Sequence, residues 1–141
     1  MGLLVDTNVL ISFERKRITA NEMLQALQAS YGNAEIAVSS ISALELAHGI
    51  ARAKTLPLHM QRRTFLDDMY LYLSMIPVSN EIAERAGMIE GKLAIQGLAV
   101  DLADLLIGVT ALQLDYAVLT HNTRHFELIP GLEVVAPTFT L

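Results

Sequence analysis

Short apolar runs alternate along this chain with longer segments in which apolar residues recur every three or four positions. The short runs are bounded by polar residues or turn formers, which is typical of buried strands. They are Leu3–Val5, Ile36–Val38, Tyr116–Thr120 and Glu133–Val135. A further candidate, Ile76–Val78, contains Pro77, which restricts it to a sheet edge or to the start of a strand.

The longer segments have the periodicity of helices that bury one face. They extend from Thr7 to about Lys16, from about Ala20 to Ser30, from about Ser42 to Lys54, from Leu58 to Met75, from Asn80 to Gln96 and from Asp101 to Leu114. Strands that alternate with helices indicate a parallel sheet that is covered on both faces. Because the 141 residues contain no linker or repeat, we expect a single α/β domain over residues 1–141.

Three acidic residues stand among apolar neighbours. Asp6 directly follows the first strand, and Glu45 and Asp104 lie within apolar helices. A carboxylate in such surroundings is unfavourable unless it is paired, hydrogen-bonded or bound to a metal. Since ligand sites of open α/β sheets lie at the carboxyl ends of strands, Asp6 is the first candidate for a catalytic residue.

Two glycines strengthen this interpretation. Gly49 lies four residues after Glu45 and Gly108 four residues after Asp104, so each acid has a glycine one turn along its own helix face. This spacing predicts that the helices approach the sheet closely and gather the acids at one point. Clustered carboxylates suit a hard divalent cation, Mg²⁺ or Mn²⁺, which polarises a phosphodiester and promotes attack by water.

Each acid also has a structural interpretation, and the residues alone leave both open. The acid after the first strand suits the N-cap of the first helix. Asp101 and Asp104 have the spacing of a variant capping box. Glu45 is spaced to pair with His48 or Arg52 along one helix face.

Other catalytic patterns are absent from the sequence. The chain has no Ser-His-Asp arrangement, Walker loop or Gly-x-Gly-x-x-Gly motif. The four histidines lack the spacing of metal ligands, so we expect them at surface or packing positions. They are His48, His59, His121 and His125.

Composition bounds the class of protein. Hydrophobic residues make up 52% of the chain and the mean hydropathy is +0.41, so we expect apolar surface to be covered by another subunit or a partner. No apolar run reaches the ~18 residues that cross a bilayer. The absence of cysteine excludes disulfides and thiolate metal sites, and Met1-Gly2 lacks the basic start of a signal peptide. We therefore expect a cytoplasmic protein with no membrane association.

Charge is unevenly distributed. The net charge of −5 argues against a broadly basic nucleic-acid binder. However, seven of the ten Lys and Arg residues lie in residues 1–63, which carry +2, whereas residues 64–141 carry −7. A basic rim beside an acidic centre is compatible with a phosphodiester substrate bound through a metal, and equally with ordinary solvated helix faces.

Five motifs in this order resemble those of the PIN-domain nucleases, specifically the VapC-type toxins of toxin–antitoxin pairs. They are Leu3–Ile11, Ser40–Gly49, Asp104–Leu112, Val118–Phe126 and Ile129–Leu132. The resemblance covers nearly the whole chain. It implies a three-layer α/β/α fold with a central parallel sheet, and a Mg²⁺-dependent endoribonuclease that hydrolyses RNA to leave a 5′-phosphate and a 3′-hydroxyl. It further implies a homodimer, inhibition by an antitoxin protein, and contact with operator DNA only through that antitoxin.

By position, the resemblance assigns Asp6, Glu45 and Asp104 to the metal site. Asp6 and Asp104 are the expected direct ligands, and Glu45 is expected to bind metal or to orient water. Four further residues are assigned supporting roles, as hydroxyl donors, as a brace for the first turn or as an additional acid. They are Thr7, Asn8, Thr120 and Asp101.

The sequence departs from the family pattern at one position. Asn122 stands where many relatives have a fourth acid, and it coordinates through a carbonyl oxygen or hydrogen-bonds a neighbour without adding charge. The number of bound metal ions is therefore left open. Arg15, Arg52 and Arg124 are candidates for contacts with RNA phosphates, or are ordinary solvated charges.

Two other functions compete with the nuclease. The missing fourth acid favours a PIN-like binding scaffold, which acts through an antitoxin and operator DNA with little nuclease activity. A receiver-like or phosphatase-like domain with a phospho-accepting Asp6 ranks last, because no second acid stands beside that residue. The sequence does not identify the RNA, since loop shape rather than a readable code sets that choice.

Overall fold

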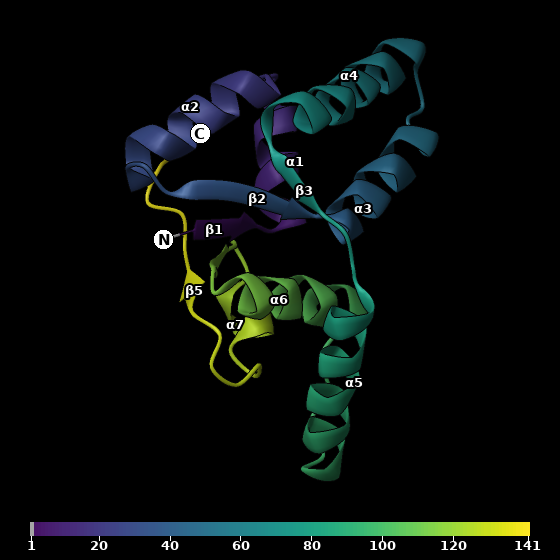
Figure 1. The fold of residues 1–141 in the computed structure, drawn as a ribbon. Helices are drawn as coiled ribbons and strands as arrows, with labels where there is room; N and C mark the ends of the chain where they lie inside the picture. Colours follow the sequence, from purple (N-terminus) through teal and green to yellow (C-terminus); the bar gives the residue numbers. More distant parts are fainter. Residues whose placement is uncertain (1) are drawn as a thin grey trace.

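The computed structural model describes residues 2–141, which form a three-layer α/β/α fold (Figure 1). Five parallel strands make one sheet in the order β3-β2-β1-β4-β5. The strands are β1 (Gly2–Val5), β2 (Glu35–Ser39), β3 (Ser74–Ile76), β4 (Ala117–Leu119) and β5 (Val134–Val135). The predicted fold class, a central parallel sheet between two helical layers, is confirmed.

Within residues 2–141, seven helices connect or cover these strands. They are α1 (Thr7–Arg15), α2 (Ala20–Tyr31), α3 (Ser40–Ala51), α4 (Leu56–Tyr72), α5 (Asn80–Ile95), α6 (Leu102–Leu114) and α7 (Thr123–Phe126). Helices α1, α2 and α4 lie on one face of the sheet, and α5, α6 and α7 on the other (Figure 1). No helix in this part of the chain is long and apolar enough to span a membrane.

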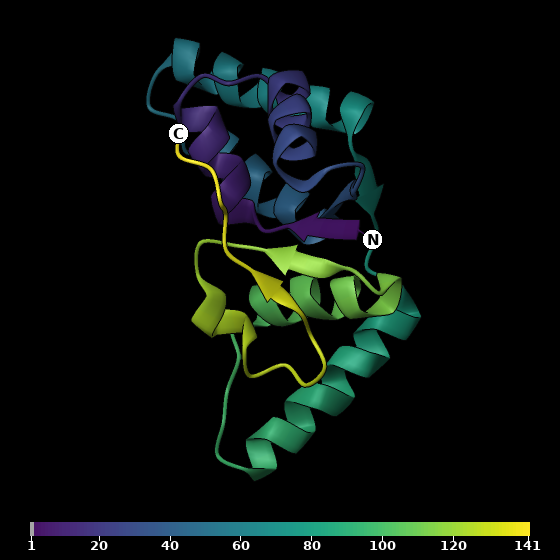
Figure 2. The same cartoon turned by 90° about the vertical axis from the view of Figure 1, so that its left-hand side faces the viewer.

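The strands divide their side chains between two apolar cores, one on each face. In β1, Leu3 and Val5 enter the core beneath α1, α2 and α4, whereas Leu4 enters the core beneath α5 and α6. In β4, Leu119 and Val118 divide in the same way. Burial on both faces explains why these strands are continuous apolar runs rather than alternating ones. Figure 2 shows β1, β4 and β5 following one another across the sheet.

The predicted boundary between the fourth helix and the third strand was wrong. The sequence predicted a helix from Leu58 to Met75 and a strand at Ile76–Val78, but α4 ends at Tyr72 and the strand is Ser74–Ile76. Large apolar residues extend from Met69 to Leu73 and resume directly after Ser74, so periodicity alone gives no clear boundary there. Backbone pairing of β3 with β2 decides the position of the strand.

The start of each of the first six helices is fixed by a polar side chain that accepts a hydrogen bond from a backbone N–H of the first turn. At α2 the bond is reciprocated by Glu22, which completes a capping box. The capping residues, in helix order, are Asp6, Thr19, Ser39, Thr55, Ser79 and Asp101. The structural interpretations of Asp6 and Asp101 as caps are therefore confirmed, which leaves their chemical roles to be decided by their surroundings.

Candidate functional site

The candidate site lies where the chain reverses its direction of travel across the sheet. From β1 the chain proceeds to β2 and β3 on one side, and it then returns to β4 and β5 on the other. The connections after β1 and β4 consequently separate, and open α/β sheets bind ligands at this point. Asp6 follows β1 and Thr120 follows β4, and the backbone N–H of Asp6 donates to the carbonyl oxygen of Leu119 at 2.9 Å.

Asp6 is nearly enclosed, with 5% of its surface exposed. Its Oδ1 accepts a hydrogen bond from the Thr7 backbone N–H at 2.8 Å, and its Oδ2 accepts one from the Thr120 hydroxyl at 2.8 Å. Burial raises the pKa of Asp6 to about 6; the two hydrogen bonds oppose this shift, and the charges of Asp104 and Glu45 add to it. Carboxylates on α3 and α6 thus act on the carboxylate that follows β1 at the switch point.

Glu45 is held from the first turn of α1. The Thr7 hydroxyl donates to Oε1 of Glu45 at 2.7 Å. The same hydroxyl oxygen lies 2.8 Å from the Ser42 hydroxyl, and because Thr7 has one proton, Ser42 is the donor in that contact. Ser42, which is fully buried, was missed as a site residue because its sequence context is a run of helix caps. The predicted pairing of Glu45 along its own helix is not found within residues 2–141.

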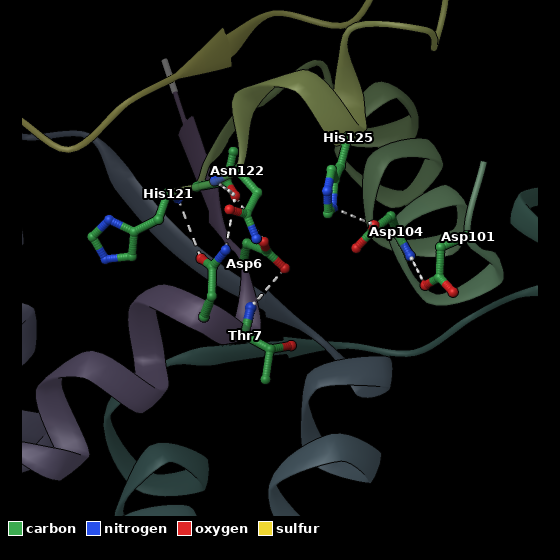
Figure 3. Close-up of polar contacts among 9 residues, drawn as sticks. Asp6, Thr7, Asp101, Asp104, His121, Asn122 and His125 are labelled. Atoms are coloured by element: carbon green, nitrogen blue, oxygen red, sulfur yellow. Dashed lines mark hydrogen bonds and ion pairs between the residues drawn. The ribbon is translucent and has the colours of Figure 1, made fainter.

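Asp104 occupies the first turn of α6, opposite Asp6 (Figure 3). Its backbone N–H donates to Oδ2 of Asp101 at 3.4 Å, and its side-chain Oδ2 lies 3.2 Å from Nδ1 of His125 on α7. Burial raises the pKa of Asp104, and the charge of Asp101 adds to the shift, whereas His125 opposes it.

His125 is a surface residue, as expected, with 59% of its side chain exposed, but its ring also contacts a site carboxylate. No local spacing could have revealed the contact, since the two residues are far apart in the sequence.

A second ring of polar contacts braces the strand ends. Asn8 donates through Nδ2 to the Thr120 hydroxyl oxygen at 3.3 Å and accepts at Oδ1 from the backbone N–H of His121 at 3.3 Å. The backbone N–H of Asn122 donates to the same Thr120 oxygen at 3.0 Å. Thr120 is therefore the hub of these contacts. The exposed Asn122 side chain makes no capping bond to α7, so its metal-binding role stays a prediction.

The three candidate phosphate contacts are not brought together. Arg15 and Arg52 line a pocket of about 570 Å³ that borders Glu45, whereas Arg124 is exposed on α7 and does not line it.

The glycines also differ from expectation. Gly49 faces Arg62, and Gly108 packs against Ile129, Leu132 and Phe126 rather than against the sheet. Close approach of these helices to the sheet therefore does not explain how the acids are gathered.

The donor chemistry of the site fits a hard divalent cation. Asp6, Glu45 and Asp104 offer only oxygen atoms, and a cation between them would offset the repulsion that helps to raise the pKa of Asp6. In the described range of 2–141, however, no group of three or more Asp, Glu or His side chains is close enough together to hold a metal ion. A bound cation would therefore have to draw these carboxylates together.

With this geometry established, comparison with known proteins identifies the family. The family model described as PIN domain matches residues 3–132. This chain belongs to the PIN-domain family. The PIN domain described above is 33% identical over 135 residues to a protein of Rickettsia bellii named Ribonuclease VapC, with 96% of each chain covered. It is 31% identical to Ribonuclease VapC1 of Methanocaldococcus jannaschii, over 94% of this chain and 85% of that protein.

Among solved structures, this PIN domain resembles the Rickettsia felis complex titled VapBC2 bound to a DNA fragment from their promoter. The TM-score is 0.80 at 26% identity, with 96% of this chain and 98% of that chain covered. A Salmonella typhimurium structure of DNA-bound VapBC has a TM-score of 0.79 at 24% identity, over 96% and 98% of the two chains, and supports the fold. The resemblance to the VapC type of PIN domain, predicted from five motifs, is confirmed.

Proposed function

We propose that this PIN domain is an endoribonuclease that hydrolyses RNA phosphodiester bonds with bound Mg²⁺ or Mn²⁺. The observation that carries the proposal is the buried Asp6, whose pKa is raised in part by Asp104 and Glu45. A buried carboxylate that is opposed by two other carboxylates at a switch point is costly to maintain for structure alone. The relatives named Ribonuclease VapC support the choice of RNA and of hydrolysis.

Asp6 and Asp104 are the proposed direct ligands, with Glu45 as a third oxygen donor or as the residue that orients water. A bound divalent cation would polarise the scissile phosphate and offset negative charge on the leaving oxygen. Thr120 holds Asp6 through Oδ2, and Thr7 holds Glu45 through Oε1. We assign to the second oxygen of Glu45 the role of accepting a proton from the attacking water. Water adds to phosphorus as the bond to O3′ breaks, and a proton passes to that oxygen, which gives a 5′-phosphate and a 3′-hydroxyl.

The supporting residues orient the Asp6 carboxylate through Thr120. Asn8 and Asn122 both donate to the Thr120 oxygen, so the hydroxyl proton of Thr120 is directed at Asp6. With a pKa of about 6, Asp6 is mostly ionised at neutral pH, which is the form that binds a cation.

We further propose that this chain is the toxin of a VapBC-type pair and forms a homodimer. Large apolar side chains are exposed on α3, α4, α5 and α6, which is more than a solitary domain needs. They include Leu44, Leu56, Leu71, Met88, Ile95 and Leu102. A second copy and an antitoxin would cover such surfaces, and operator DNA would be contacted only through the antitoxin, in the cytoplasm. Light scattering of the purified chain, alone and with the product of a neighbouring gene, measures both associations.

The decisive experiment compares the wild type with Asp104→Asn on total RNA, with Mg²⁺ and with EDTA, and maps the new 5′ ends. We expect 5′-phosphate ends that require both Asp104 and the metal. Asp115→Asn provides a matched control, because Asp115 is an exposed acid at the other end of the same helix and Asn tolerates its left-handed backbone. Cleavage by Asp104→Asn at the wild-type rate would defeat the site assignment.

The alternative function, a PIN-like binding scaffold with little nuclease activity, predicts a different result for metal binding and cleavage. A chain that binds its antitoxin but shows neither cleavage nor stabilisation by Mg²⁺ would be a scaffold rather than a nuclease. Thermal unfolding with and without Mg²⁺ makes this distinction without depending on the choice of RNA.

A further inference from the structure

A pocket of about 570 Å³ lies between α1, α3 and α4, directly beside the acidic site. Its volume is in the range of small-molecule sites. Glu45 belongs to both places, since it lines the pocket while its Oε1 is held by Thr7. A ligand in this pocket would therefore reach the site where the phosphodiester is proposed to be cut.

The walls of the pocket are apolar. Ile11 from α1 and Leu46 from α3 are partly buried, and the ring of Phe65 from α4 lies at the base. Leu44 stands at the rim with 63% of its surface exposed. Such walls suit one face of a flat, weakly polar group such as a nucleobase, whose contacts are made by stacking and apolar packing.

One of the three arginines in the pocket is committed to the fold. Nη1 of Arg62 donates to the carbonyl oxygen of Gly49 at 2.6 Å, and Nε of Arg62 lies 4.0 Å from Oε1 of the buried Glu14. Gln61 donates to the same Glu14 oxygen at 3.1 Å. Arg62 and Glu14 thus neutralise each other and connect α4 to α1 and α3.

The other two cations are available to a ligand. Arg15, at the end of α1, and Arg52, just after α3, are exposed at the pocket, and their side chains form no ion pair within the part of the chain that the structure describes. Guanidinium groups bind phosphate oxygens in a bidentate manner. An anion that contacts both Arg15 and Arg52 would be held beside Glu45, and the ion pair between Arg62 and Glu14 would stay intact.

We propose that this pocket binds one unpaired nucleotide of the RNA next to the scissile bond, with its base against the apolar walls and its phosphate on Arg15 and Arg52. This inference rests on the proposed ribonuclease function. Bases of a duplex are stacked and paired, so the substrate must present a single-stranded loop or end. The position of the pocket also suits an RNA strand. A nucleotide bound in the pocket would place the next phosphate of the strand at the acidic site. The apolar walls of the pocket favour a nucleobase over the charged side chains of an acidic peptide.

The test uses the full-length Asp104→Asn protein, which separates binding from cleavage. Fluorescence anisotropy would measure its affinity for a labelled single strand of about ten nucleotides and for the same sequence as a duplex, at one salt concentration. We expect the single strand to bind more tightly. Adding Arg15→Gln and Arg52→Gln should weaken single-strand binding about tenfold or more, and adding Leu44→Ala instead should weaken it several-fold.

Two matched controls keep the result specific. Arg63→Gln removes an exposed guanidinium of α4 that is bound to Asp67 outside the pocket, and Leu98→Ala removes an exposed leucine in the connection after α5. Both should leave RNA affinity unchanged within about twofold. Unchanged affinity after loss of both pocket arginines would overturn the proposal, as would equal affinity for the duplex.

The outcomes also test the nucleotide pocket and the proposed ribonuclease activity independently of each other. A wild type that cuts RNA, combined with pocket variants that bind it normally, leaves the ribonuclease intact and rejects the nucleotide site. Arginine-dependent binding of single strands in a protein that cuts no RNA supports the pocket and rejects the enzyme. If hexaglutamate binds as tightly as the RNA and depends on the same arginines, the pocket is an acidic-peptide site instead.

Discussion

Thr120 donates a 2.8 Å hydrogen bond to Oδ2 of Asp6, and this contact joins the ends of β4 and β1 at the switch point of the sheet. The two residues are 114 positions apart in the sequence. The Thr120 oxygen also accepts from Asn8 and from the backbone of Asn122, so three segments depend on one hydroxyl group.

We therefore expect Thr120→Val to destabilise the fold. The valine fills the same space but leaves Asp6 without one donor and two N–H groups without an acceptor, which should cost about 1–3 kcal/mol in the free energy of unfolding. Urea denaturation measures the loss. Thr110→Val is the matched control, because Thr110 is equally buried but donates only to the Leu106 carbonyl of its own helix. A similar loss in both variants would contradict a special role for Thr120.

The pKa of Asp6 predicts a pH dependence of stability. Its ordinary pKa of 3.8 is raised to about 6 on folding, so the folded state binds a proton more tightly than the unfolded state does. The associated stability is present below pH 3.8 and is lost as the pH rises through 6. The loss in the metal-free protein is on the order of 3 kcal/mol.

Asp6→Asn removes this titration. Urea denaturation in EDTA measures the unfolding free energy of the wild type and of Asp6→Asn. Between pH 4.5 and 7, the unfolding free energy of the wild type should fall relative to that of Asp6→Asn. A difference that stays constant or changes in the opposite direction would show that Asp6 is not the buried acid described above.

The pKa of Asp104 should respond in opposite directions to its two neighbours. Asp101→Asn removes a negative charge and should lower the pKa of Asp104, while the asparagine still caps α6. His125→Phe removes the opposing contact and should raise it. Carboxyl NMR titration of the metal-free protein measures both shifts. Movement in the same direction would mean that the substitutions act through the fold rather than through charge.

Sequence reasoning succeeded where the signal is local. An apolar run that ends in Asp6-Thr7-Asn8 predicts a strand that passes directly into a helix, as β1 and α1 do. The caps at Asp6 and Asp101 follow from the same short-range rules. Within a parallel sheet, residues after strands share one edge, so the neighbourhood of the site could also be predicted.

Contacts between distant segments could not be predicted in this way. The Thr7–Glu45 bond links residues 38 positions apart, and the His125–Asp104 contact depends on how α7 packs against α6. The start of β3 is decided by pairing with β2, because the apolar pattern continues through Leu73 without interruption. In each case the information lies in tertiary packing, which periodicity does not encode.

The position of α7 depends in turn on Gly108, and this dependence gives the last prediction. A Cβ atom at Gly108 would lie 2.5 Å from Cδ1 of Ile129, a side chain that is itself 98% buried and so has no free space to enter. Gly108→Ala should therefore destabilise the fold by about 1–3 kcal/mol, because the segment after α6 must shift.

Gly91→Ala provides the contrast, since Gly91 lies on the exposed side of α5 with nothing within 4 Å of the added atom. That change should stabilise the fold by about 0.5–1 kcal/mol through helix propensity. Urea denaturation of both variants compares the two effects directly. If Gly108→Ala were also stabilising, Ile129 would have to move freely, and the packing that presents His125 to Asp104 would be looser than the contacts in this structure require.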